Sequence, residues 1–251
     1  MKYLIYLLFP FLTFSQEKAI EITYKVIYNT EVPNTKNGYL YVSSNQKKTV
    51  YFIKDIKKIE KTKNLEADAT VILDSGEKRF NYFDYEKDSI LTKEDILGSS
   101  NLIKEKIPVI TWKLLKETKT LDNTTLYKAT CYFRGRNYIA WYATDTAIKA
   151  GPWKFHGLPG LIYEISDETQ RYNWVLQKIK GTDFNFQSND FDLNNKQIIT
   201  LKEYAKLKFN YNNLNKKLLA RLPRNAKIKN PRTFRTGFEI KFEWEEEAKK
   251  D

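Results

Sequence analysis

The chain has almost none of the residues from which disulfides, zinc sites and histidine-based catalytic centres are built. Cys131 is the only cysteine and His156 the only histidine among 251 residues. A single cysteine excludes an intramolecular disulfide, and one cysteine with one histidine cannot supply the usual ligand set of a zinc site. No metal and no cofactor are therefore expected. Cys131 lies in an apolar segment, which predicts a buried, inert thiol.

Long apolar stretches are also missing, except at the N-terminus. Residues 3–14 form an apolar run behind Lys2, and the sequence turns polar from Ser15. About a dozen residues are fewer than the ~20 of a membrane-spanning helix, and the pattern is typical of a secretory signal peptide. We therefore expect residues 1–15 to be a signal peptide, with a core helix as the alternative. Residues 16–251 would form an exported domain without a transmembrane span, either periplasmic, outer-membrane-associated or extracellular.

Glycine and proline are few, at 9 and 7 residues, whereas aromatic residues make up 15% of the chain. This composition is typical of a folded β protein with an aromatic core. The formal net charge of +12 favours anionic partners, such as lipopolysaccharide phosphates, anionic glycans or an acidic protein surface. Nucleic acid also fits the charge, but export from the cytoplasm argues against it.

Short alternating runs separated by turns fill most of the chain. Residues 20–28 alternate apolar and polar side chains with one lapse, and residues 39–42 and 49–53 predict a hairpin. Further strands are predicted at residues 69–73, 79–85, 89–92, 102–107, 126–133, 137–143, 161–166 and 171–179. Strands of this length, with turns about every eight to twelve residues, indicate an antiparallel sheet, sandwich or barrel.

One helix and one further strand are predicted near the C-terminus. Thr200 and Glu203 form a capping box, and apolar residues then recur at helical spacing until Pro223, which predicts a helix over about 200–222. Its lysines fall mostly on the other face, which indicates either a solvated basic side or a surface for an anionic lipid or a partner. Strict alternation over residues 236–244 predicts a strand that closes the sheet.

The expected fold is a single mainly-β domain. We expect a strongly curved antiparallel sheet or partly open barrel of roughly ten to twelve strands, with one helix packed on it. No internal repeat, Gly/Ser linker or composition break supports a second domain.

A loop rich in glycine and proline, residues 151–162, lies between two predicted hairpins. Its end, residues 157–162, reads GLPGLI. This hexapeptide resembles the one that names the GLPGLI family, also called Porph_ging, of secreted Bacteroidota proteins, and residues 140–143 and 151–155 also fit that family's pattern. The resemblance covers roughly residues 131–167. It implies a secreted protein and assigns no activity to any residue.

The loop has two interpretations. In the structural one, apolar side chains plug one end of a curved sheet, and glycines permit the bends. In the functional one, the same side chains line the mouth of an apolar cavity and bind a ligand or partner. The predicted contact residues are Trp141, Tyr142, Trp153, Phe155, His156, Leu158 and Pro159, and the predicted structural residues are Gly151, Pro152, Gly157 and Gly160. His156 itself is either a hydrogen-bonded structural residue or a pH-sensitive contact.

The predicted function is that of a non-enzymatic envelope protein. It would bind an apolar or anionic envelope ligand, or dock to an outer-membrane protein complex, through residues 151–162, and peripheral membrane contact fits the same prediction. No catalytic residue is assigned. The alternative is a carboxylate-dependent hydrolase of an extracytoplasmic polysaccharide or peptide, with Glu164 and Asp167 as the acids nearest the loop. A purely structural surface protein is a third interpretation.

Overall fold

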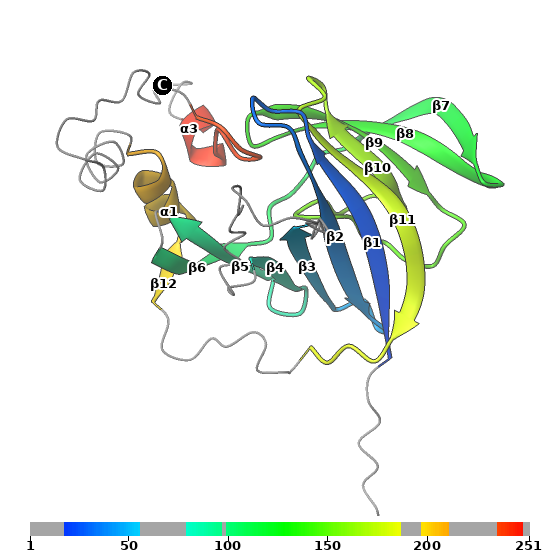
Figure 1. The fold of residues 1–251 in the computed structure, drawn as a ribbon, viewed down its shortest axis with the longest axis horizontal. Coiled ribbons are helices and arrows are strands. Elements are labelled where there is room, and N and C mark those ends of the chain that lie inside the picture. The colour runs from blue at the N-terminus through cyan, green and yellow to red at the C-terminus, as the bar shows by residue number, and fades with distance from the viewer. Residues whose placement is uncertain (1–17, 56–78, 97–98, 187–196, 211–234, 248–251) are drawn as a thin grey trace, which may run out of the picture.

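The computed structural model describes residues 18–55, 79–96, 99–186, 197–210 and 235–247. The predicted signal peptide, the strand at 69–73 and the helix beyond residue 210 lie outside the described residues. Within them, twelve strands form one sheet, one short helix lies beside an edge of that sheet, and a second short helix lies near the first (Figure 1). The domain is thus mainly β, as the sequence predicts.

The strands follow one another across most of the sheet. They are β1 (Ala19–Tyr28), β2 (Asn34–Ser43), β3 (Lys48–Asp55), β4 (Phe80–Asp84), β5 (Ser89–Ile96), β6 (Ser99–Lys106), β7 (Lys113–Leu121), β8 (Thr124–Phe133), β9 (Arg136–Ala143), β10 (Leu161–Asp167), β11 (Tyr172–Thr182) and β12 (Ile198–Thr200). Their order is β12-β6-β5-β4-β3-β2-β1-β11-β10-β9-β8-β7. All neighbours pair antiparallel except β12 and β6, which are parallel.

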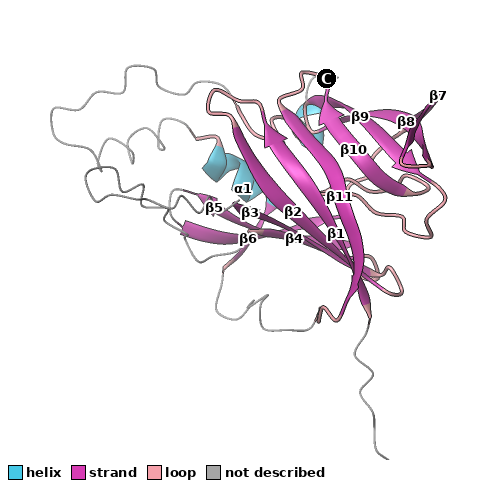
Figure 2. Cartoon of the chain, turned by 45° about the vertical axis from the view of Figure 1, so that its right-hand side comes forward, coloured by secondary structure: helices cyan, strands magenta, loops and turns pink. Residues whose placement is uncertain are grey.

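Alternation places the apolar residues of each strand on one face. In β1 the side chains of Ile22, Tyr24 and Val26 are fully buried, whereas Lys25 between them is exposed. Successive side chains of a strand point to opposite faces, so this pattern turns one face of the sheet toward a core. The N-terminal strand lies near the middle of the sheet, between β2 and β11, and thereby joins its two halves (Figure 2).

The sheet is neither closed nor strongly curled, which corrects the expected strongly curved sheet or partly open barrel. Strands β12 and β7 are the two edges of the strand order. An open sheet must bury its apolar face against another layer. Here the connection between β9 and β10 and the segment 235–242 supply that layer, because Trp153, Phe155 and Phe238 pack against side chains of the sheet.

Helix α1 (Leu201–Lys208) begins as predicted. The Thr200 side chain accepts a hydrogen bond from the Glu203 amide, and the Glu203 carboxylate accepts one from the Thr200 amide at 2.7 Å. These two bonds satisfy amides that have no partner inside the helix. The buried residues Leu201 and Tyr204 then pack with Ile103 of β6. None of the helices in the described residues is long and apolar enough to cross a membrane.

The predicted strand at 236–244 is wrong. This segment is irregular up to Phe242, and helix α3 (Glu243–Glu247) follows. The amides of residues 240 and 241 both donate to the carbonyl of Arg134, so the segment crosses the β8–β9 turn instead of pairing along a strand. Its alternation has another cause: Phe238 packs on the main core, whereas Phe242 packs with Tyr204.

Candidate functional site

The loop 151–162 lies in the centre of the core. Trp153, Phe155 and Leu158 are buried, with 5%, 2% and 3% of their surface exposed. The Phe155 ring centroid lies 4.7 Å from that of Tyr138 and 5.5 Å from that of Trp174, in edge-to-face contacts that favour aromatic pairs. The loop therefore plugs the apolar face of the sheet, which is the structural interpretation of its sequence.

The backbone of the loop explains why it is rich in glycine. Gly157 has a φ of +87°, a conformation that side chains disfavour. At Gly160 an added Cβ would lie 1.8 Å from the carbonyl oxygen of Ala143, so no side chain fits there. Trp153 adopts a φ of +54°, which is unusual for a bulky residue and is maintained by the packing of its ring.

His156 is hydrogen-bonded to other parts of the protein through its ring and its backbone carbonyl. Its Nε2 lies 2.9 Å from the Pro108 carbonyl oxygen, and a carbonyl can only accept, so Nε2 carries the hydrogen. The Trp112 indole donates to the His156 carbonyl at 2.8 Å, and the rings of Phe83 and Tyr85 lie nearby. Burial lowers the pKa of His156 below its ordinary value, and the bond to Pro108 opposes this only partly. His156 is therefore neutral at pH 7.

Acidification from pH 7.5 to 5.5 should destabilise the protein partly through His156. Because its pKa is lower in the folded than in the unfolded state, the unfolded state binds more protons once the pH falls below the ordinary histidine pKa of about 6.5. The melting temperature should therefore fall across this range, and His156→Gln should flatten the dependence. Thermal unfolding of both proteins at several pH values measures this effect. Equal slopes for the two proteins would contradict it.

The other predicted contact residues do not converge on one cavity mouth. Trp141 and Tyr142 are neighbours in β9, so they lie on opposite faces of the sheet. Tyr142 is buried on the core side, whereas the Trp141 ring lies beneath the Lys119 ammonium at 4.6 Å. Pro159 is exposed. The sheet therefore separates side chains that the functional interpretation brought together.

Beside the loop lies a buried ion cluster, which we define as Glu105, Arg134, Lys154 and Glu239. Lys154 belongs to the loop and is 1% exposed. Its Nζ lies 2.5 Å from a Glu105 carboxylate oxygen and 2.8 Å from one of Glu239. Arg134 donates to the same two carboxylates through its two Nη atoms. Its Nε also donates to Glu243 at 3.0 Å.

Four separate segments supply the buried ion cluster. Glu105 lies near the end of β6, Lys154 comes from the loop, and Glu239 comes from the C-terminal segment. Arg134 begins the tight β8–β9 turn, where Arg134 and Gly135 both have positive φ, as a type I′ hairpin turn requires. The cluster thus connects the plug, the sheet and the segment that crosses the turn.

The charges of the buried ion cluster compensate one another. Burial alone would raise the pKa of Glu239, but Lys154 and then Arg134 outweigh it and hold that pKa at about 2. Burial would lower the pKa of Arg134, and Glu239 and Glu105 reverse this. Two cations face two buried carboxylates in the cluster, and the lowered pKa of Glu239 keeps that acid ionised at neutral pH. Such a pair tolerates burial only with this compensation.

The buried ion cluster was not predicted from the sequence. Its members are far apart in the chain, and no spacing motif links them. One signal was present: Lys154 is the only Lys, Arg, Asp or Glu residue of the loop 151–162. A single charge in an otherwise apolar loop indicates a buried ion pair, because an unpaired buried charge is too costly.

The two acids predicted as hydrolase candidates do not form a pair. Glu164 lies 2.5 Å from the Lys119 ammonium on the outer face of the sheet. Asp167 is buried, lies 3.2 Å from Arg136 and accepts the Tyr172 amide at 2.8 Å, so it organises the β10–β11 turn. Within the described ranges, no three His, Cys, Asp or Glu side chains are grouped as a metal ion would require.

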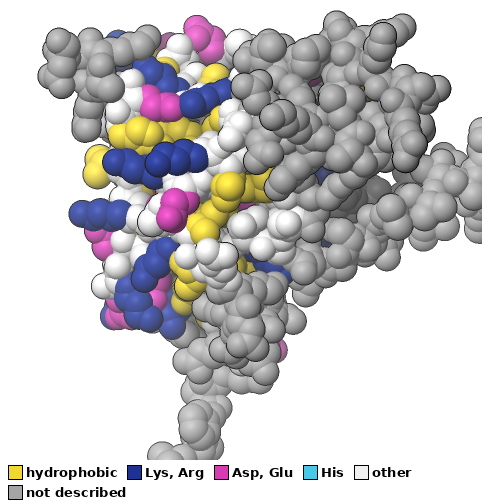
Figure 3. All heavy atoms as spheres, turned by 90° about the vertical axis from the view of Figure 1, so that its left-hand side faces the viewer, with side chains coloured by type: hydrophobic (Ala, Val, Ile, Leu, Met, Phe, Trp, Pro, Cys, Tyr) yellow, Lys and Arg dark blue, Asp and Glu magenta, His cyan; other side chains and the backbone are white. Residues whose placement is uncertain are grey.

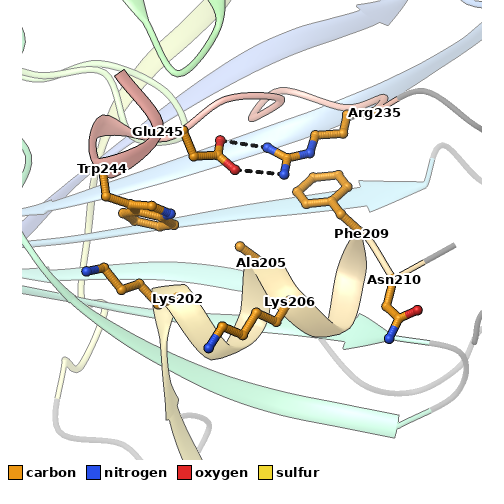
Figure 4. A pocket seen from close by; sticks show the side chains of 8 residues that line it. All are labelled: Lys202, Ala205, Lys206, Phe209, Asn210, Arg235, Trp244 and Glu245. Carbon is orange, nitrogen blue, oxygen red and sulfur yellow. Dashed lines mark hydrogen bonds and ion pairs between the residues drawn. The ribbon is translucent and has the colours of Figure 1, made fainter. Parts of the chain in front are cut away.

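A hollow of about 880 Å³ lies between α1 and the C-terminal segment 235–247, which includes α3, and we call it the helix groove (Figure 4). It is lined by Lys202, Ala205, Lys206, Phe209, Asn210, Arg235, Trp244 and Glu245. Lysine and arginine thus surround two aromatic rings, with one carboxylate among them. None of the residues predicted from the loop lines this hollow.

A second hollow, of about 410 Å³, lies over β8 and β9. Its lining includes Cys131, Tyr138 and Glu168. Burial raises the pKa of the Cys131 thiol to about 12, so the cysteine stays protonated at neutral pH. The predicted buried thiol is confirmed, and its protonated state makes it a poor nucleophile.

The fold is similar to solved structures of PNGF-II in two space groups. The TM-scores are 0.50 and 0.51, at 15% and 16% sequence identity over 77% of this chain. The chain spans about a third of the PNGF-II chains, 33% in each case, and at this identity the similarity shows the fold alone.

A domain assigned to outer-membrane lipoprotein sorting, from Vibrio parahaemolyticus, matches with a TM-score of 0.25 and 6% identity over 71% of this chain and 91% of its own. A TM-score of this size does not show a shared fold. No protein-family model matches the chain. No curated protein matches it either.

Proposed function

We propose that this protein is a non-catalytic binding protein of the bacterial cell envelope, exported by its N-terminal signal. It binds a small envelope ligand or docks to an outer-membrane complex. The resemblance of residues 157–162 to the GLPGLI family supports the location. The observation that carries the proposal is the helix groove, a hollow of about 880 Å³ with aromatic and cationic walls. Its volume falls in the range of small-molecule sites, about 300–1,000 Å³.

The loop 151–162 has a supporting role in this proposal. Trp153, Phe155 and Leu158 are buried in the core, so they shape the scaffold rather than contact a ligand directly. Lys154 links the loop to Glu239, three residues before Phe242, which packs against α1 residues. The loop therefore contributes to the position of the segment that forms one wall of the helix groove.

The alternative hydrolase has weaker support. The described chain does hold close, buried acids, because Glu105 and Glu239 share Lys154 and Arg134. A general acid needs a pKa raised toward neutrality, and that of Glu239 is instead held at about 2. Glu94 has a pKa raised by burial, which Lys208 opposes. Neither described hollow is lined by any of these acids.

The test is mass spectrometry of the tagged mature protein purified from its native envelope, with proteins and lipids scored together. The proposal predicts one near-stoichiometric ligand or outer-membrane partner that a tagged, unrelated exported protein does not retain. If the two tagged proteins retained the same set of proteins and lipids, the proposal would be contradicted. Release of product from envelope polysaccharide or peptide by the purified protein would establish the hydrolase instead.

A further inference from the structure

Two lysines of α1 form one wall of the helix groove. Lys202 and Lys206 are four residues apart, so they lie on the same side of the helix, and both are exposed. No ion pair joins either of them to a carboxylate among the described residues. The carboxylate between them in sequence, Glu203, bonds to the Thr200 amide and hydroxyl. The wall therefore presents two ammonium groups to whatever enters the groove.

The opposite wall is aromatic. The rings of Phe242 and Trp244 stack with centroids 4.7 Å apart and an angle of 4° between their planes. Trp244 lines the groove, and the Lys202 ammonium lies 5.6 Å from its ring centroid. Phe209 lines the other end, with the Arg235 guanidinium 4.5 Å from its centroid. Apolar surface thus lies directly beside positive charge.

Among the described residues that line the groove, the one carboxylate is already neutralised. Glu245 accepts two hydrogen bonds from Arg235, both at 2.7 Å, as Figure 4 shows. The bond from Arg235 holds the pKa of Glu245 below its ordinary value, with burial opposing. Three cations against one acid leave the lining positive. The face of the molecule that includes α1 also shows lysine and arginine interspersed with hydrophobic side chains (Figure 3).

We propose that the helix groove binds a small anionic amphiphile, which rests on the function proposed above. Its anionic group, a phosphate or carboxylate, would lie between Lys202 and Lys206, and its apolar body would lie on Trp244 and Phe209. Size favours a small ligand over a protein partner. A stable protein interface buries about 800 Å² on each side, whereas eight residues from two short segments line this hollow.

The experiment titrates the full mature chain with octyl phosphate, octanol and inorganic phosphate, followed by calorimetry and tryptophan fluorescence. Octyl phosphate should bind with a fluorescence change. Octanol and inorganic phosphate should bind at least about tenfold more weakly, because octanol lacks the anionic group and inorganic phosphate lacks the apolar chain. Binding should weaken further with salt. Equal affinity for octyl phosphate and octanol, or for octyl phosphate and inorganic phosphate, would overturn the proposal.

Variants assign the binding to this groove. Lys202→Glu with Lys206→Glu should weaken octyl phosphate binding at least about tenfold, and Trp244→Ala should weaken it by a similar factor and reduce the fluorescence change. The matched control is Lys25→Glu with Lys178→Glu, two exposed lysines of β1 and β11 that change the net charge equally. The control should bind like the natural protein. Equal losses of octyl phosphate affinity in the two double variants would show that the ligand is attracted by the net charge alone. That result would overturn the assignment of the site to the groove.

The two proposals can fail separately. If the envelope preparation yields a specific ligand or partner that the Lys202/Lys206 variant still retains, the binding function stands and the groove assignment is wrong. If octyl phosphate binds as expected while nothing is retained from the envelope, the groove chemistry is supported and the envelope function is contradicted. Circular dichroism of every variant confirms that losses of binding are not losses of fold.

Discussion

Replacement of Lys154 by methionine should lower the free energy of unfolding by about 3–5 kcal/mol. The variant leaves Glu105 and Glu239 buried, and Arg134 is then the one cation among the described residues that still bonds to both. One negative charge is then uncompensated in the interior, where water cannot solvate it. Urea unfolding at pH 7, followed by circular dichroism, measures the loss.

A second substitution distinguishes charge from packing in that result. Glu239→Gln combined with Lys154→Met removes the surplus charge, so the double variant should be more stable than Lys154→Met alone. Lys47→Met is the control, because the Lys47–Glu86 pair is exposed and its loss should hardly matter. A double variant as unstable as the sum of the single ones would mean that the two side chains act independently.

The same cluster sets a dependence on pH. The pKa of Glu239 is lowered to about 2 in the folded protein, against 4.5 ordinarily. Its stabilising contribution is therefore complete above about pH 4.5 and is lost as the pH falls toward 2. Without Lys154 this carboxylate should protonate more readily. The difference in the free energy of unfolding between Lys154→Met and the natural protein should accordingly become smaller as the pH falls below neutral. Urea unfolding of both proteins at several pH values measures this difference.

Trp153→Ala should lower the free energy of unfolding by about 3–5 kcal/mol, the usual cost of removing a large buried aromatic side chain. The Trp153 ring centroid lies 5.0 Å from that of Phe155 and 5.2 Å from that of Phe238, so its removal opens a cavity between the loop and the C-terminal segment. Chemical unfolding measures the change, and the folded variant should bind octyl phosphate less tightly if the groove wall shifts.

Trp141→Ala is the matched control for Trp153→Ala. Trp141 is only partly buried and lies on the opposite face of the sheet, with the Lys119 and Lys128 ammonium groups 4.6 and 5.8 Å from its ring centroid. Trp141→Ala should lower the free energy of unfolding clearly less than Trp153→Ala does, because neighbouring side chains and water can occupy the space that the ring leaves. Equal losses in the two variants, or a loss at Trp153 below about 1 kcal/mol, would contradict the central position of the loop in the core.

Much of the local structure follows from the sequence alone. The alternation of residues 20–28 determined β1, since a period of two fits only an extended chain with one buried face. The capping box at Thr200 and Glu203 determined where α1 begins, because its bonds are made within four residues. Cys131 in an apolar strand indicated a buried thiol for the same local reason. Each of these features depends on neighbours in sequence.

Only the tertiary structure decided the rest. In residues 236–244, Phe238 packs in one hydrophobic cluster and Phe242 in another. The same alternating pattern would arise from a strand, so the local sequence could not distinguish the two. Lys154 can be buried because it bonds to Glu105 and Glu239. These two residues lie 49 and 85 residues away along the chain. The helix groove likewise needs α1 beside the C-terminal segment. Contacts at such separations depend on the completed sheet, whereas periodicity and capping report only on adjacent residues.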